Sequence, residues 1–307
     1  MLFKIKYYLI GALSIIPLDF YFNQILSPQK KEQVLKLLLR LVLLGAVLAT
    51  FSGLVGYFTG FNPLRMVHVQ TERNGGLFGM LMTYGHSIAW LSLILVAMCS
   101  HFKSIQKLIS FGPLLFCIFV SLLGLFTSHV RGAWLAFLAG CLLINKKLTM
   151  VLVVLMVLGA LGGQLHNPDF FKTQIVRKTS NEERVGSWLA AIKAFQEKPL
   201  LGYGYLNFEP HSKEIKERYG LPVADFGGHA HNDFLEILAT SGIFGAICFL
   251  SWLFLWWKEM GKRRDLGTQL VRPFMVCFIV SGLTQVTFND GECQFFVMIV
   301  YALSLVI

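Results

Sequence analysis

Long apolar stretches separated by short polar segments make up most of the sequence. A helix needs about 20 mostly apolar residues to cross a bilayer, and most of these stretches approach or exceed that length. The pattern predicts an all-α bundle of about nine transmembrane helices, with residues 1–307 forming a single transmembrane domain. The stretches fall at about 3–26, 35–57, 77–100, 109–128, 132–145, 149–163, 233–257, 269–287 and 293–307.

Lysine and arginine clusters occur at every second loop between the predicted helices, as cytoplasmic loops of membrane proteins do. Placing all the clusters inside sends segment 164–232, the only long loop, to the other side of the membrane. This segment is predicted to be a small, partly helical extracytoplasmic (periplasmic) cap. The clusters are Lys30/Lys31/Lys36, Lys103/Lys107, Lys146/Lys147 and Lys258/Lys262/Arg263/Arg264.

The composition excludes several classes of protein. The chain is 55% apolar and only 14% charged, whereas a soluble domain has about 25% charged residues. A formal net charge of +10 would suit nucleic acid, but no binding motif or basic stripe accompanies it, so a nucleic-acid partner is not expected. The six cysteines show no CxxC pair, so neither a disulfide framework nor a zinc site is expected.

Two arginines on the predicted outer side of the membrane, one at the membrane face and one in the long loop, are candidates for anion binding. Arg131 stands between two apolar stretches, at a predicted membrane face. Its guanidinium suits phosphate oxygens, although an interfacial arginine that reaches into water is the alternative. Arg184 follows Ser180, which with Glu183 reads as a capping box that starts a helix. A helix N-terminus with an arginine suits phosphate, and a solvated ion pair with a neighbouring glutamate is the alternative.

Two histidines precede the next apolar stretch, in the segment from Gly227 to Glu236. His229 and His231 with nearby carboxylates suggest a metal site, but residues at i and i+2 do not share a helix face, and no further ligand motif is present. A histidine at this place suits a general base, because its pKa lies near ambient pH. A capping or packing histidine is the alternative. Arg65, Arg73 and His86 are secondary candidates, around an earlier loop.

Together, these segments resemble the O-antigen ligase and polymerase superfamily of bacterial membrane glycosyltransferases. The most specific match is the ligase pattern of His-[Asn/Ser/Gln], nine residues and Gly-x-x-[Gly/Thr/Tyr]. Here that pattern reads His231-Asn232, residues 233–241 and Gly242-Ile243-Phe244-Gly245.

Three further segments carry the resemblance. Residues 131–136 resemble the family's Ser-Arg-Gly-x-x-Leu segment, although His129 and Val130 stand where the serine is usual. Residues 199–204, with Arg184 and Trp188, resemble its outer-loop pattern, and residues 73–79 resemble its Arg-x-x-Gly-x-Phe-Gly segment. Members of the family usually have more spans than are expected here, which implies further spans before this chain.

The resemblance implies a metal-independent transferase without a cofactor, in the bacterial inner membrane. It would transfer a glycan from a polyprenyl (undecaprenyl) diphosphate carrier to the lipid A–core of lipopolysaccharide at the periplasmic face, among membrane lipids. The resemblance assigns Arg131 and Arg184 to the diphosphate and His231 to activation of the acceptor hydroxyl. Asn232, which follows His231 in the motif, joins the secondary candidates.

Other functions stay open at this point. An O-antigen polymerase or a protein O-oligosaccharyltransferase of the same superfamily would share the donor chemistry and differ in the acceptor. A lipid or glycan transporter would be expected to bury charges in the middle of its spans and to show paired halves. The candidate charges instead gather at the predicted outer edge, which disfavours transport.

Overall fold

The computed structural model describes residues 13, 15–71, 75–169, 178–223, 228–263 and 265–306. The described chain is almost entirely helical, with one two-residue strand pair, so the predicted all-α class is confirmed. The elements before the long loop are η1 (Phe20–Ile25), α2 (Pro28–Thr59), β1 (Phe61–Asn62), β2 (Val67–His68), η2 (Gly76–Phe78), α3 (Leu81–Ser100), α4 (Phe102–Ile105), α5 (Phe111–Thr127), α6 (Arg131–Ile144) and α7 (Lys146–His166). After them come α8 (Lys178–Glu197), α9 (Phe208–Arg218), α10 (Asp233–Lys262), α11 (Leu266–Thr284) and α12 (Gly291–Val306).

The apolar helices agree with the predicted membrane spans. Helices α2, α3, α7, α10 and α11 are long and apolar enough to cross a membrane, and α5, α6 and α12 are shorter apolar helices. Each predicted stretch from 35–57 onward coincides with one of these helices. The first stretch, 3–26, lies partly outside the described residues. The chain is therefore a multi-pass membrane protein.

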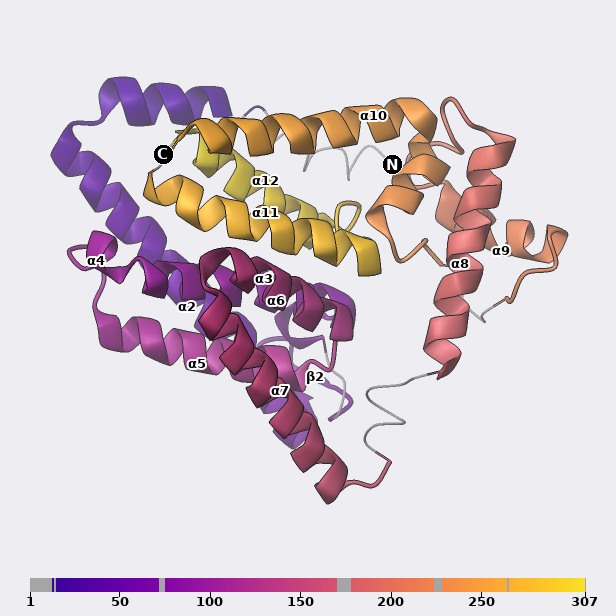
Figure 1. Ribbon diagram of the computed structural model, residues 1–307, viewed down its shortest axis with the longest axis horizontal. Coiled ribbons are helices and arrows are strands. Elements are labelled where there is room, and N and C mark those ends of the chain that lie inside the picture. The colour runs from indigo at the N-terminus through magenta and orange to yellow at the C-terminus, as the bar shows by residue number, and fades with distance from the viewer. Residues whose placement is uncertain are drawn as a thin grey trace.

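The centre of the bundle is formed by α3, α6 and α11, which lie side by side (Figure 1). Gly140 on α6 lets that helix approach Leu93 of α3, as small residues do between membrane helices. The indole of Trp90 is fully buried and packs edge-to-face against Phe274 and Phe278 of α11. This aromatic packing fixes α3 against α11.

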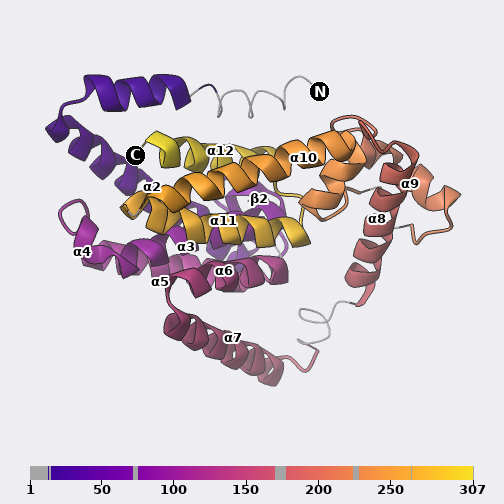
Figure 2. The ribbon, with the colours of Figure 1, turned by 45° about the horizontal axis from the view of Figure 1, so that its top comes forward.

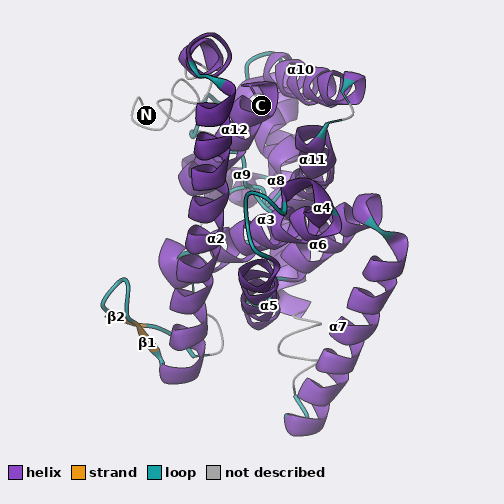
Figure 3. Cartoon of the chain, turned by 90° about the vertical axis from the view of Figure 1, so that its left-hand side faces the viewer, coloured by secondary structure: helices purple, strands orange, loops and turns teal. Residues whose placement is uncertain are grey.

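Helix α7 differs from the central helices because it lies at the edge of the bundle (Figure 2). Most of its side chains are exposed, and nearly all of them are apolar. Figure 3 shows it projecting away from the other helices, on the side opposite the β1–β2 pair. An exposed helix of this composition suits contact with lipid.

Helices α8 and α9, with the turns that follow them, form a unit at the end of the bundle where α10 begins (Figure 1). We call residues 178–223 the α8–α9 cap. The capping box predicted at Ser180 is wrong, because Lys178 and Thr179 are already helical and Ser180 lies inside α8. Arg184 therefore stands almost two turns into the helix rather than in its first turn.

The face that α8 buries consists of small residues. Ala190, Ala191 and Ala194 are fully buried, whereas the larger Val185 and Leu189 are exposed. Small side chains let α8 pack closely on α9 and on the start of α10.

The cap is joined to a break in α10. Gly242 has a φ of 62°, which interrupts the helix, and Gly202 in the turn beside it has a φ of 64°. A side chain on either glycine would overlap the backbone of the other segment. Four backbone hydrogen bonds cross between the turn and the break: Tyr203 N–H to Ala239 O, Gly204 N–H to Thr240 O, Ile243 N–H to Pro199 O and Phe244 N–H to Leu200 O. The break thus exposes backbone groups that the turn satisfies, and the two glycine motifs are one structure.

Candidate functional site

His231 stands in the loop before α10, in a left-handed conformation with a φ of 49°. Its Nδ1 lies 2.7 Å from Oε1 of Gln285, and the amide nitrogen of Gln285 lies 3.0 Å from Nε2 of His229. An amide oxygen only accepts, so Nδ1 of His231 carries the proton and donates. Nε2 of His231 is then the unprotonated nitrogen, which is the form that a general base requires.

The surroundings of the histidine pair favour the neutral rings. The centroids of the two histidine rings are 4.3 Å apart. Residues at i and i+2 would not share a helix face, but both histidines precede α10, so this restriction does not apply to them. The pKa of His231 is lowered to about 4. Burial is the largest cause, and the neighbouring His229, Arg184 and Lys216 contribute to the same shift. Burial also lowers the pKa of His229. Both rings are therefore neutral at neutral pH.

The polar residues that follow His231 hold the loop in place. Asn232 caps α10, with its side-chain oxygen accepting from the N–H groups of Phe234 (2.9 Å) and Leu235 (3.1 Å). The buried Asp233 accepts from the N–H groups of Thr287 and Phe288, each at 2.8 Å. These contacts tie the start of α10 to the α11–α12 loop.

Glu236 completes the support of the histidine loop. Its carboxylate accepts from the N–H of Ala230 at 2.8 Å, between the two histidines. The carboxylates that follow the histidines in the sequence therefore bind backbone groups of this region. Among the described residues, no group of three His, Cys, Asp or Glu side chains is placed to hold a metal ion.

Arg131 and Arg184 come to the same end of the bundle from segments about 50 residues apart in the chain. Arg131 is the first residue of α6, and its Nη2 donates to Oδ1 of Asn181 on α8 at 2.9 Å. Arg184 stands on the next turn of α8, and its charge acts on both His229 and His231. The structure thus brings the arginines and the histidine that were singled out in the sequence into one region.

The secondary candidates from the earlier loop do not all lie in the same region. His86 is buried on α3 and interacts electrostatically with Arg184, so it belongs to the same region. The guanidinium of Arg65 lies against Gly79, close to the start of α3. Arg73 lies outside the described residues.

Sequence reasoning missed two residues of this site. Gln285 bridges the two histidines from the end of α11, and no local pattern marks it. Lys216 on α9 is only 1% exposed, and its Nζ donates to Oγ of Ser187 on α8 at 3.0 Å. A signal for Lys216 did exist, because it shares the helical spacing of the buried Phe208 and Ser212.

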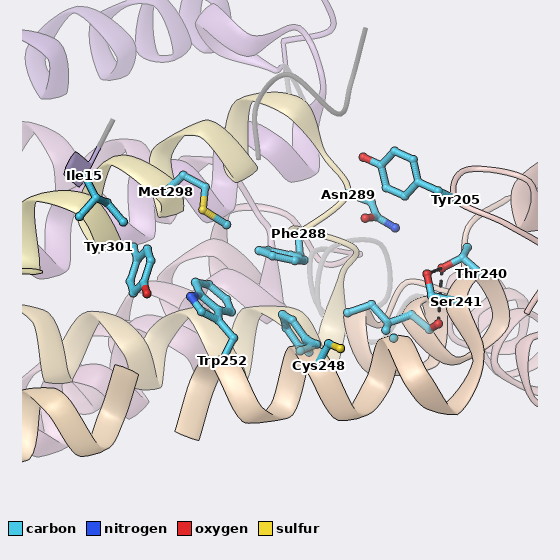
Figure 4. Close-up of a pocket in the computed structure, with 13 residues that line it drawn as sticks. Ile15, Tyr205, Thr240, Ser241, Cys248, Trp252, Phe288, Asn289, Met298 and Tyr301 are labelled. Carbon is cyan, nitrogen blue, oxygen red and sulfur yellow. Dashed lines mark hydrogen bonds between the residues drawn. The ribbon is translucent and has the colours of Figure 1, made fainter. Parts of the chain in front are cut away.

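An apolar groove of about 510 Å³ runs along α10, with α12 and the α11–α12 loop on its other side (Figure 4). Thr240, Ser241 and Asn289 give one end polar character, and Trp252 and Tyr301 line the other end. The polar end is the one nearer the histidine loop, because α10 begins directly after His231. This end of the groove lies about two helical turns after the start of α10, and Arg131, Arg184 and His231 do not line it.

Two comparisons with known proteins agree with the motif resemblance. A family model described as O-antigen ligase matches residues 115–250, which include Arg131, Arg184 and His231. An O-antigen ligase of Pseudomonas aeruginosa is similar to this chain, with 26% identity over 259 residues. The match covers 80% of this chain and 57% of that relative, so this chain spans little more than half of the relative's length. Both findings support a relationship to the O-antigen ligase superfamily, and residues 115–250 of this chain match its family model.

Proposed function

We propose that this protein is an O-antigen ligase, which transfers a glycan from a polyprenyl diphosphate carrier to the lipid A–core of lipopolysaccharide. The observation that carries the proposal is the meeting of Arg131, Arg184 and His231 at one end of the bundle, inside the matched family domain. The reaction would take place at the periplasmic face of the inner membrane, with segment 164–232 on that side. The alternating basic clusters in the sequence support this orientation.

In the proposed reaction, an acceptor sugar hydroxyl attacks the anomeric carbon of the donor glycan. The new carbon–oxygen bond forms as the bond from that carbon to the diphosphate breaks. The hydroxyl proton passes to Nε2 of His231, which the hydrogen bond to Gln285 leaves unprotonated. The leaving diphosphate gains negative charge, which the guanidinium groups of Arg131 and Arg184 would stabilise.

The apolar groove along α10 supports a lipid-linked donor. A polyprenyl diphosphate has an anionic head and a long apolar chain, so its site needs a positive end that continues into an apolar channel. The polar end of the groove, at Thr240 and Ser241, lies about two helical turns after the start of α10, and the groove continues to Trp252 within the span. We propose that the polyprenyl chain lies in this groove while the diphosphate lies among the arginines.

The lipid profile of cells that lack this gene tests the choice of acceptor. Loss of a ligase leaves the lipid A–core bare and lets long glycans accumulate on the polyprenyl carrier, and this is the result we expect. A core that carries a single repeat unit would show a polymerase instead. An unchanged lipid profile with loss of a protein glycan would show a protein-directed transferase of the same superfamily.

A further inference from the structure

Lys216 is a buried cation without an acidic partner at close range. Its side chain is 1% exposed, and among the residues that the structure describes its amine forms no ion pair. Its hydrogen bond goes to the neutral hydroxyl of Ser187. Lysine is almost never fully buried unless it is paired, because removing its charge from water is costly. The residue therefore needs an explanation other than packing.

The position of Lys216 relates it to both halves of the candidate site. Ser187, which it contacts, stands one turn after Arg184 on α8. Ser212, one turn before Lys216 on α9, accepts from the N–H of Gly228 at 3.0 Å, next to His229. One face of α9 thus contacts the helix that carries Arg184 and the loop that carries the histidines.

Two charged residues of α8, Glu183 and Arg184, lie near Lys216. The carboxylate of Glu183 acts on it from beyond ion-pair distance, whereas Arg184 adds a second positive charge on the same helix. The charges of both Lys216 and Arg184 act on His231. The buried Lys216 charge, with a second cation on the neighbouring helix, suits an anionic ligand, which would act as a counterion for Lys216.

We propose that Lys216 supplies a further positive charge to the diphosphate site, and that the bound diphosphate is its missing counterion. This inference rests on the proposed function and adds a residue to it. Lys216 acts at a distance, through the field it creates and through its hold on Ser187, so it is a positioning residue. Arg131 and Arg184 remain the groups proposed to contact the phosphate oxygens.

The charge of Lys216 also affects the pKa of His231. The groups that act on His231 are His229, Arg184, Lys216 and the amide of Gln285, and Asp290 acts on His229. Of these, His229, Arg184 and Lys216 lower the pKa of His231 and so preserve the base, whereas the hydrogen bond to Gln285 raises that pKa. Loss of the Lys216 charge is therefore expected to shift the acidic limb of the activity profile to higher pH.

The sharpest test places a counterion beside Lys216 without removing it. In Ser187→Asp, a carboxylate would pair with the amine, and Ser187→Asn is the matched neutral variant. The affinity of the purified protein for inorganic diphosphate, measured by calorimetry, is expected to fall about tenfold in Ser187→Asp relative to Ser187→Asn. Its thermal stability is expected to be no lower, because the new carboxylate satisfies a buried charge.

Direct removal of the charge gives a second measurement. Lys216→Met should weaken diphosphate binding by a similar factor, whereas Lys216→Arg should retain most of it. Lys213→Met, at an exposed lysine of the same helix, is the control and should bind like the wild type. The Ser187 pair still decides the question if Lys216→Met does not fold.

The outcomes separate this inference from the proposed function. Equal diphosphate affinity in Ser187→Asp and Ser187→Asn, with a wild type that binds, would overturn the role of Lys216 alone. A folded wild-type protein that does not bind diphosphate would overturn the proposed function and this inference with it. Weaker diphosphate binding in Ser187→Asp, together with an acidic limb of the activity profile that moves to higher pH in Lys216→Met, would support both.

Discussion

The bundle centre and the end formed by the α8–α9 cap both bury polar side chains, but they do so in different ways. In the centre, the indole N–H of Trp90 donates to Ser281 at 3.0 Å, and between α10 and α12, away from the cap, the indole N–H of Trp256 donates to Ser304 at 2.9 Å. These partners are neutral, and each pair joins two membrane helices. Such pairs satisfy buried donors and leave no net charge.

At the cap end, the buried or partly buried groups include cations, the two histidine rings and the carboxylates of Asp233 and Glu236. Lys216 donates to the hydroxyl of Ser187, and Arg184 and Lys216 together act on His231. The buried charge of Lys216, which forms no ion pair with a described residue, costs stability. The centre is thus held by neutral packing contacts, whereas the cap end gathers charged and titratable groups, which suits the anion binding and proton transfer that we propose for it.

The largest effect is expected from His231→Ala. Removal of the base should lower glycan transfer by about 10²–10⁴-fold while membrane insertion and thermal stability stay close to the wild type. His211→Ala, at an exposed histidine on α9, should leave transfer unchanged. Near-normal transfer by a folded His231→Ala protein would remove His231 from the catalytic role.

Arg131→Lys should have the next largest effect. The charge is kept, but an ammonium cannot form the two parallel hydrogen bonds that a guanidinium offers to phosphate, so transfer should fall by about tenfold or more. Arg218→Lys, at an exposed arginine of α9, is the control. Wild-type rates in Arg131→Lys would favour the alternative of an arginine that serves only the membrane interface.

The pH profile of the wild-type protein tests the electrostatics of the cap end, and its expected effect is smaller than those of the two substitutions above. A base must be unprotonated, and the lowered pKa of His231, about 4, extends its unprotonated range toward acid. Transfer should therefore stay nearly constant down to about pH 5, whereas an unperturbed histidine would lose activity near pH 6.5. Arg184→Met should move the acidic limb to higher pH. A wild-type midpoint near pH 6.5 would contradict the neutral histidine pair.

The smallest effect is expected in the bundle centre. Trp90→Phe removes the donor to Ser281 and keeps most of the aromatic packing, so the protein should lose about 1 kcal/mol of stability. A thermal melt in detergent would record this loss, and transfer per folded molecule should not change. Strongly reduced transfer by the folded variant would show that the two regions are not as separate as their chemistry indicates.

The sequence predicted the membrane helices well, because a helix that crosses the bilayer needs a long apolar stretch and such stretches are easy to recognise in the sequence. It did not predict the break in α10. Gly242 lies within an apolar stretch, and its partner Gly202 belongs to a turn 40 residues earlier. It also misplaced the start of α8 at Ser180, because a local capping pattern cannot exclude a helix that begins earlier.

The site was accessible to sequence reasoning only where a residue stands out locally. Arg131 and His231 lie next to apolar stretches, and a charged or titratable residue there is conspicuous. Lys216 and Gln285 look like ordinary polar residues, since their role depends on contacts with α8 and with the histidine loop. The helical spacing of Phe208, Ser212 and Lys216 places these residues on one face of α9, but the sequence does not show that this face packs on α8.

Transfer by the purified protein tests the central claim most directly. The protein would be reconstituted in liposomes with a polyprenyl diphosphate glycan and lipid A–core, in the presence of EDTA, and the products would be separated on a gel. The account predicts glycan-bearing lipid A–core from the wild type and none from His231→Ala. Transfer that EDTA abolishes and a divalent ion restores would contradict the metal-independent mechanism. No transfer by the folded wild-type protein under any of these conditions would contradict the proposed ligase function of this chain.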